Sequence, residues 1–428
     1  MEHMDATPDT SAYIADFSRF LEASPSSYHA AAEVARRLDA AGFTALAESQ
    51  AWPTGSGKHY VIRDGAIVAW SQPAASGPTT PFRILGAHTD SPGFKLKPKP
   101  TIGLHGWLQA GVEVYGGPLL NSWLDRELEL AGRLVTRDGR EYLVRTGPFM
   151  RIPQLAIHLD REQNNGLTLD KQRHTKPVFG VGDASSADLV DHLASLAGID
   201  GWDVAGYDIL TADTQSPARF GIDNDLFAAG RMDNLSSVYA GLTALLDAPD
   251  ARHISVLAAF DHEELGSESR SGASGPMLDD ILTRIGAGLG ASASEKLQAY
   301  AESWCVSADA GHSVHPNYSE KHDGANQPVM GSGALLKINA NQRYATDAVG
   351  AALWERACAS ADVPYQEFVS NNTVPCGSTI GPLTATRLGI RVVDVGVPLL
   401  SMHSARELAH VDDLVGLSRA VGAFFAGV

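Results

Sequence analysis

Cysteine is rare in this sequence, and the few cysteines match no metal or disulfide spacing. The 428 residues include three cysteines, Cys305, Cys358 and Cys376. An odd number in so long a chain, without a Cys-x-x-Cys pair, excludes a disulfide scaffold and a thiolate zinc finger. A chain of this length buries a large core without such covalent supports.

Positive charge is scarce relative to negative charge. The chain has 33 Lys and Arg against 50 Asp and Glu, which gives a formal net charge of −17 with His neutral. Nucleic acids and anionic membranes attract basic surfaces, so the composition argues against both as partners. Hydrophobic residues make up 44% and charged residues 19%, which is typical of a globular protein and not of a disordered one.

Long hydrophobic runs are also missing. No apolar run approaches the roughly 18 residues that a membrane-spanning helix needs. Residues 1–5 (MEHMD) contain neither the basic nor the apolar region of a signal peptide. We therefore expect a soluble cytoplasmic protein.

The two flanks of the sequence alternate between helical and strand patterns. Apolar residues at helical spacing predict two helices within residues 1–42, the second capped by Ser26 or Ser27. Asp412 is expected to cap a last helix. Alternation of helices with buried strands is typical of an α/β sandwich around a largely parallel sheet. The predicted strands include 60–62, 66–70, 82–86, 254–260, 303–307 and 390–397.

The middle of the sequence has a different pattern, with frequent turn signals. Residues 137–140 (RDGR) separate two short apolar runs and predict a hairpin. Residues 94–99 (FKLKPK) alternate apolar and basic side chains, which favours an edge strand protected by Lys and Pro. We therefore expect a β-rich domain at 93–229, inserted into a discontinuous α/β domain made of 1–92 and 230–428.

Side chains that bind metals follow several of the predicted strands. In open α/β sheets, sites form beyond the carboxyl ends of the strands, so these side chains are expected to converge. The candidates are His88 and Asp90 after 82–86, Glu263 and Glu264 after 254–260, Asp309 after 303–307, His403 after 390–397, and Asp233 at the start of a helix.

Imidazole and carboxylate ligands together favour zinc, with cobalt or manganese as substitutes. One catalytic zinc needs about three protein ligands, and five or more candidates indicate two metals that share a carboxylate and hold a bridging hydroxide. Asp90 can orient the ring of His88. Of the adjacent Glu263 and Glu264, one can bind metal while the other acts as a general base.

Each of these signals is weak by itself. A lone His-x-Asp is usually incidental, a Glu-Glu pair is usually a solvated face, and Asp233 alone is more often a helix cap. His403 alone could be a core histidine. The joint placement after separate buried strands favours the metal site. Gly266 stands where a zincin helix needs its second histidine, which excludes that motif.

Seven strings, in order and at matching spacing from about residue 10 to the C-terminus, resemble the aspartyl aminopeptidase family. They are AHTDSPGFKLKP (87–98), RMDNLSS (231–237), FDHEELGS (260–267), SADAGHSVHPNY (307–318), LLKINANQRYAT (335–346), PCGSTIGP (375–382) and SMHSARE (401–407).

The resemblance implies a zinc exopeptidase with two Zn²⁺ per subunit. Its fold is a three-layer α/β/α catalytic domain with an inserted β-rich dimerisation domain, and its dimers assemble into a tetrahedral dodecamer. The implied metal ligands are Asp233 as the bridge, His88 and Asp309 on one metal, and Glu264 and His403 on the other. Glu263 is implied as general base, and Asp90 as the residue that orients His88.

The resemblance further implies a preference for peptides with a free N-terminal Asp or Glu. Lys337, His312 and His158 match the residues that contact substrate. In relatives, the histidine matched by His158 reaches the site of a neighbouring subunit. A local cation suits an acidic substrate, because the chain as a whole repels anions.

Two other functions stay open at the level of sequence. A related zinc amidohydrolase that deacylates amino acids could use the same metal set, and it differs in not requiring a free substrate amine. A non-catalytic oligomeric scaffold is the third possibility, although a scaffold has no need of Glu263.

Overall fold

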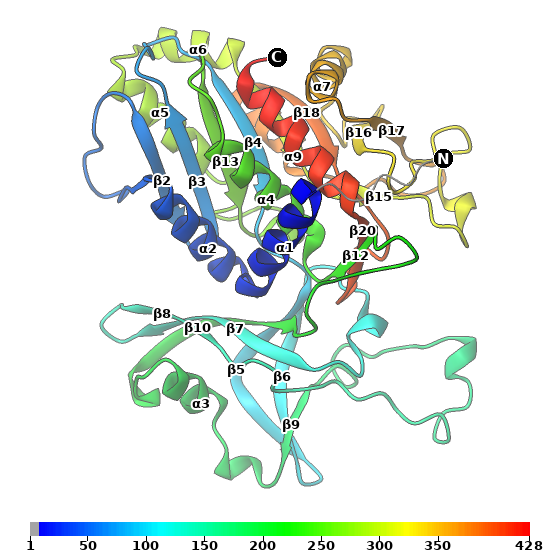
Figure 1. The fold of residues 1–428 in the computed structure, drawn as a ribbon. Coiled ribbons are helices and arrows are strands. Elements are labelled where there is room, and N and C mark those ends of the chain that lie inside the picture. The colour runs from blue at the N-terminus through cyan, green and yellow to red at the C-terminus, as the bar shows by residue number, and fades with distance from the viewer. Residues whose placement is uncertain (1–7) are drawn as a thin grey trace.

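The structure is a computed structural model that describes residues 8–428. Figure 1 shows a helix-covered sheet above a second, smaller sheet. The strand order is β1-β2-β3-β13-β4-β14-β18-β16-β17 in the nine-stranded sheet and β8-β7-β10-β5-β6-β9 in the six-stranded sheet. No helix among the described residues is long and apolar enough to cross a membrane.

The centre of the nine-stranded sheet is parallel, as the sequence predicts. The β13–β4, β4–β14 and β14–β18 pairs are parallel, whereas the β2–β3, β3–β13 and β18–β16 pairs are antiparallel. The strands are β1 (Thr44–Ala45), β2 (Gly57–Arg63), β3 (Ala66–Gln72), β4 (Phe82–His88), β13 (Ile254–Phe260), β14 (Trp304–Ala308), β16 (Ala334–Ile338), β17 (Tyr365–Val369) and β18 (Arg391–Gly396).

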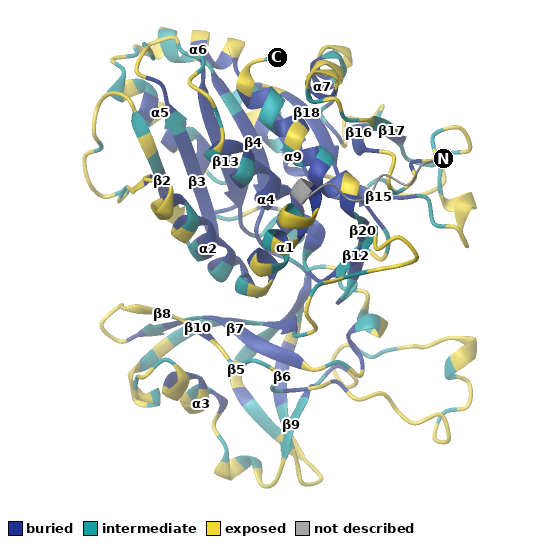
Figure 2. Ribbon diagram, in the orientation of Figure 1, coloured by how far each residue is buried: buried dark blue, intermediate teal, exposed yellow. Residues whose placement is uncertain are grey.

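Helices cover both faces of this sheet and complete three α/β/α layers (Figure 2). Successive strand residues point to opposite faces, so Leu85 of β4 packs in one core and Ile84 in the other. One face packs against α1 (Pro8–Ala23), α2 (Ser27–Ala40), α4 (Met232–Leu246), α7 (Ala348–Ala361) and α9 (Val411–Ala426). The other packs against α5 (Met277–Gly288), α6 (Ala293–Glu302) and α8 (Ile380–Leu388).

The six-stranded sheet has its own apolar core. Phe94, Leu130 and Ile209 from the sheet pack with Leu193 of α3 (Leu189–Leu196). The hairpin predicted around residues 137–140 is confirmed, because β7 and β8 pair on either side of it. The strands are β5 (Gly93–Leu104), β6 (Trp107–Tyr115), β7 (Leu128–Thr136), β8 (Glu141–Arg145), β9 (Val178–Val181) and β10 (Val204–Asp213).

Two small sheets complete the fold. Strands β11 (Ala218–Phe220), β12 (Leu226–Ala229) and β20 (Glu407–His410) form one of them, and β15 (Gly311–His312) pairs with β19 (Pro398–Leu399) in the other. β12 and β20 come from distant parts of the chain, so this pairing fixes the segment before α4 against the segment before α9.

Local details correct two predictions from the sequence. The edge-strand prediction for 94–99 is wrong, because β5 lies between β6 and β10; Lys95 is accommodated there by an ion pair with Asp208 at 2.7 Å. Asp412 does not cap α9, because the side chain of His410 accepts the main-chain N–H of Asp412 instead. Ser26, one of the two serines considered, does cap α2.

Candidate metal centre

The carboxyl ends of three adjacent parallel strands bring the predicted ligands together. β4 ends at His88, and Asp309 directly follows β14. After β13, His262 has a left-handed backbone (φ 63°), and the chain turns into a short 3₁₀ helix that begins at Glu263. Because β13, β4 and β14 are neighbours in the sheet, these three turns lie together at the carboxyl ends of the strands.

Asp233 lies between two groups of candidate ligands. Its Oδ1 is 3.3 Å from Nε2 of His88, which is in turn 3.6 Å from Oδ1 of Asp309. Its Oδ2 is 3.3 Å from Nε2 of His403, and that nitrogen is 3.4 Å from Oε2 of Glu264. Each oxygen of the Asp233 carboxylate therefore faces a different histidine.

The unpaired atoms of this cluster fit a divalent metal. Asp233 Oδ1 and Glu264 Oε1 are buried, and neither has a hydrogen-bond partner within residues 8–428. Ligand atoms of His88, Asp233 and Glu264 all lie within 4.8 Å of one another. Buried carboxylate oxygens without donors are costly, and a bound cation removes that cost. Nitrogen and carboxylate oxygen are also the donors that zinc takes in catalytic sites.

The pKa values of the cluster also indicate a site for a cation. Burial and the nearby Asp309 and Asp233 charges raise the pKa of Glu263 to about 7. Burial disfavours a charged ring at His403, but the hydrogen bond to Asp233 and the Glu264 charge outweigh it and raise its pKa to about 10. In the absence of another cation the surrounding negative charge thus stabilises a proton on Glu263 or His403, and a metal ion would displace that proton.

Asp90 organises the turn that carries both glutamates. Its two side-chain oxygens accept the main-chain N–H groups of Glu263 at 3.0 Å and Glu264 at 3.2 Å. Nδ1 of His88 lies 3.4 Å from Asp90 Oδ1 and 3.0 Å from the Asp90 main-chain oxygen. These acceptors favour a proton on Nδ1, which leaves Nε2 of His88 directed at Asp233 and Asp309.

Tyr115 also supports the candidate metal centre, and it was not identified from the sequence. It is the last residue of β6 in the six-stranded sheet, and its hydroxyl donates to Oδ2 of Asp90 at 2.9 Å. The two residues are 25 positions apart and follow no recognisable motif. Only the packing of the second sheet against the first brings them together.

The predicted substrate residues are placed differently from one another. Lys337 on β16 is 2% exposed, and its Nζ donates to the Ala310 carbonyl at 2.8 Å, one residue after Asp309. No carboxylate of the described chain lies within ion-pair distance of this ammonium group. His312 follows nearby, and desolvation of its ring together with the Lys337 charge lowers its pKa.

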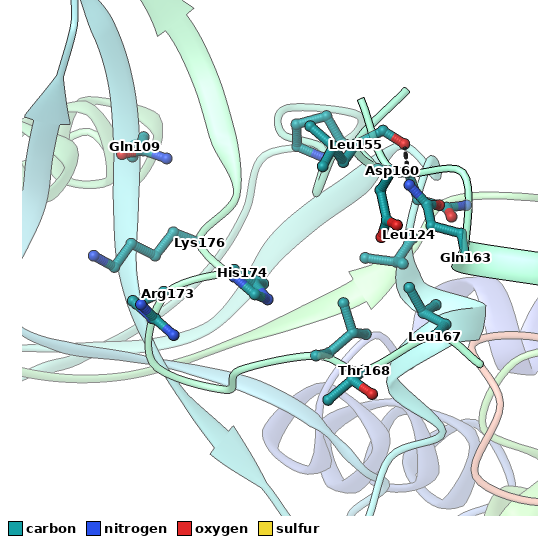
Figure 3. Close-up of a pocket in the computed structure, with 13 residues that line it drawn as sticks. Gln109, Leu124, Leu155, Asp160, Gln163, Leu167, Thr168, Arg173, His174 and Lys176 are labelled. Carbon is teal, nitrogen blue, oxygen red and sulfur yellow. Dashed lines mark hydrogen bonds between the residues drawn. The ribbon is translucent and has the colours of Figure 1, made fainter. Parts of the chain in front are cut away.

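His158 is not brought to the cluster within the single chain. It lies exposed in a turn of the long loop between β8 and β9, and no hydrogen bond or ion pair joins it to another described residue. The same loop helps to enclose a cavity of about 490 Å³ (Figure 3), which Arg173, His174 and Lys176 line together with apolar side chains. None of the candidate metal ligands lines this cavity.

Comparison with known proteins identifies the family. The model of the aminopeptidase I zinc metalloprotease (M18) family matches residues 20–425. The chain belongs to this family. It is therefore an aminopeptidase of the zinc metalloprotease class, and the family resemblance seen in the sequence is confirmed.

Individual relatives of this aminopeptidase cover nearly its whole length. A probable M18 family aminopeptidase 2 from Streptomyces avermitilis is 52% identical over 96% of this chain and 97% of its own. A chain in the cryo-EM structure of the Ape4 and Nbr1 complex superposes with a TM-score of 0.95 at 34% identity, covering 100% of this chain and 87% of that one. The S. cerevisiae mApe1 dodecamer gives 0.85 at 28% identity, covering 98% and 97%.

Proposed function

We propose that this aminopeptidase releases N-terminal Asp and Glu from peptides and that it does so with two zinc ions. The observation that carries the acidic preference is Lys337, a buried ammonium group without a carboxylate partner, one strand away from the candidate ligands. A buried ammonium group is costly when no carboxylate balances its charge, even where a carbonyl accepts one of its hydrogen bonds. The carboxylate of an acidic substrate side chain would balance it, with His312 beside it.

Two ions fit the arrangement better than one. Asp233 would bridge them, His88 and Asp309 would complete one set, and Glu264 and His403 the other, because the two Asp233 oxygens face the two histidines separately. Bound zinc would polarise the scissile carbonyl and activate a bridging water.

Glu263 is the proposed general base. Its Oε2 lies 3.9 Å from Nε2 of His88, at the border of the cluster, and its side chain stays partly accessible. Placed there, its carboxylate can take a proton from the attacking water and return it to the leaving amine. Asp90 contributes by holding the Glu263 main chain and the His88 ring in place.

The second sheet is the proposed site of self-association. We assign 1–92 and 230–428 to the catalytic domain and 93–229 to an inserted dimerisation domain. The structural similarity to the mApe1 dodecamer supports assembly of dimers into a dodecamer. In such an assembly the exposed His158 would reach the active site of a neighbouring subunit and contact substrate there.

The test compares three peptides that differ only at the N-terminus, on purified zinc-loaded protein. One begins with Asp, one with Ala, and one is the N-acetylated Asp peptide. We expect cleavage of the Asp peptide well above the Ala peptide, and none of the acetylated one. Equal rates on Asp and Ala would refute the acidic preference, and release of acetate from the third would indicate a deacylase.

A further inference from the structure

Glu407 connects two of the candidate ligands through their main chains. This residue of β20 is 2% exposed. Its Oε2 accepts the main-chain N–H of Asp233 at 3.0 Å, and its Oε1 accepts the main-chain N–H of His403 at 2.9 Å. One carboxylate therefore spans the two positions whose side chains approach each other to 3.3 Å.

The main chain at both positions lacks a regular partner of its own. Asp233 lies at the start of α4 but has non-helical angles (φ −80°, ψ 101°), so its N–H needs an acceptor from outside the helix. His403 has a left-handed backbone (φ 65°), a conformation that is uncommon for a residue with a side chain. Glu407 supplies the acceptor in both cases.

The position of Glu407 is itself fixed. It pairs with Ala229 in the β12–β20 ladder, four residues before Asp233. A helix start is ordinarily capped by a neighbouring Ser, Thr, Asp or Asn. Here the acceptor for Asp233 comes from 174 residues away, and the same carboxylate also serves His403. A residue that only capped α4 would not need to bind His403 as well.

We propose that Glu407 is a positioning residue that sets the spacing of Asp233 and His403 and thereby the affinity for the metal that they share. The proposal rests on the proposed function, in which both residues are ligands. Glu407 acts on both ligands through their main chains, because each of its oxygens accepts one of the two N–H groups.

The decisive variant is Glu407→Gln. A carboxylate accepts at both oxygens, whereas an amide of the same size has one acceptor oxygen and one NH₂ donor. One of the two N–H groups would then face a donor. We expect one zinc per subunit to bind about 10–100-fold more weakly, the range seen when residues that orient metal ligands are removed. Zinc titration of the intact protein in metal buffers, with metal analysis after dialysis, measures this, and excess zinc should partly restore kcat.

Asp413 offers a matched control. It is also a buried carboxylate that accepts two main-chain N–H groups, from Gly331 at 2.7 Å and Gly333 at 2.8 Å, and neither glycine is a candidate ligand. Asp413→Asn makes the same chemical change away from the metal cluster. We expect it to lower the unfolding temperature of the metal-free protein without changing either zinc affinity.

Two further variants make the outcomes unambiguous. If Glu407→Gln does not fold, Glu407→Asp keeps the charge but is one methylene shorter, and it should show the same loss of zinc affinity. Normal binding of both zinc ions by a folded Glu407 variant would overturn the proposal. The variant His403→Ala distinguishes failure of this proposal from failure of the proposed function. If His403→Ala also binds both zinc ions normally, the assignment of His403 as a ligand is wrong. If His403→Ala loses one ion while the Glu407 variant binds both, only the proposed role of Glu407 is wrong.

Discussion

The hydroxyl of Tyr115 donates a 2.9 Å hydrogen bond to Oδ2 of Asp90, and this contact links the six-stranded sheet to the candidate metal centre. Burial and the adjacent Asp90 charge raise the pKa of Tyr115, so the hydroxyl remains a donor at every physiological pH. Asp90 in turn holds the Glu263–Glu264 turn through two main-chain hydrogen bonds. The second sheet therefore supports the geometry of the site within one chain, in addition to its proposed role in assembly.

Tyr115→Phe should impair catalysis while leaving the fold intact. The substitution removes one hydrogen bond to a charged acceptor, which typically contributes about 1.5–3 kcal/mol. Because that bond acts on Asp90, we expect kcat to fall about 10-fold or more with little change in KM. Steady-state kinetics on an Asp-initiated peptide would measure both constants.

Tyr207→Phe is the matched control for that experiment. Tyr207 lies on β10 of the same sheet, and its hydroxyl donates to the Lys97 carbonyl at 2.7 Å, away from the metal cluster. It should lower stability by about 0.5–1.5 kcal/mol, the usual contribution of a hydrogen bond to a neutral carbonyl, without affecting kcat. Equal effects of the two variants on kcat would mean that Tyr115 acts only through general stability.

Glu263→Gln should abolish turnover but keep the metal. The amide cannot accept a proton, and general base catalysis typically contributes 10²–10⁴-fold. Because the five proposed ligands are untouched, metal analysis should give the wild-type zinc content. Glu268, exposed in the same loop, provides the control, since Glu268→Gln should leave kcat and zinc content unchanged. Near-normal turnover of Glu263→Gln would remove Glu263 from the proposed role.

The sequence predicted the parts of the site that depend on sheet order, and it missed those that depend on packing between sheets. His88, Glu263 and Asp309 follow buried parallel strands, and the ends of such strands meet wherever the sheet forms. Tyr115 reaches Asp90 across 25 positions of the chain, and Glu407 reaches Asp233 across 174, although it follows His403 by only four. Such contacts have no periodicity or spacing that a single sequence can display.

The fold shows the same division. Helices were predictable from their local apolar periodicity, and central strands from their short continuous apolar runs. The prediction of an edge strand at 94–99 failed because the same alternation of Lys and apolar residues fits two situations. It fits an edge strand, and it fits an inner strand whose Lys pairs with an acidic residue on the neighbouring strand. The partner, Asp208, is 113 residues from Lys95.

Lys337→Met should change substrate preference without loss of stability. Met has a similar shape but no charge, so the variant removes a buried ammonium group that has no carboxylate partner in the described chain. We expect kcat/KM for an Asp-initiated peptide to fall about 10–100-fold, the effect of losing a hydrogen bond to a charged group, while the value for an Ala-initiated peptide changes little.

Lys58, which is exposed on β2, gives the control variant Lys58→Met, and this change should leave both kcat/KM values as they are. If Lys337→Met lowers kcat/KM equally for the Asp and Ala peptides, Lys337 does not recognise the acidic side chain.

His29 should make stability depend on pH at the junction of the two sheets. Nδ1 of His29 lies 2.9 Å from Oγ of Ser26, the cap of α2, and burial together with the charge of Arg145 lowers its pKa to about 4. Arg145, on β8, donates to the Glu22 carbonyl at the end of α1. The unfolded chain takes up a proton on this histidine near pH 6.5, whereas the folded chain does so only near pH 4. The stabilisation is therefore complete above about pH 6.5 and is lost as the pH falls towards 4, by up to about 3 kcal/mol.

His29→Gln should flatten this part of the profile, because glutamine takes up no proton in either state. Thermal unfolding of the zinc-loaded wild type and variant at several pH values between 4 and 7.5 would show the difference between their midpoints shrinking as the pH falls. His105→Gln, at an exposed position on the β5–β6 turn, should follow the wild type throughout. A difference between wild type and His29→Gln that stays constant with pH would mean that His29 contributes packing alone, and that the junction is not sensitive to protonation at this position.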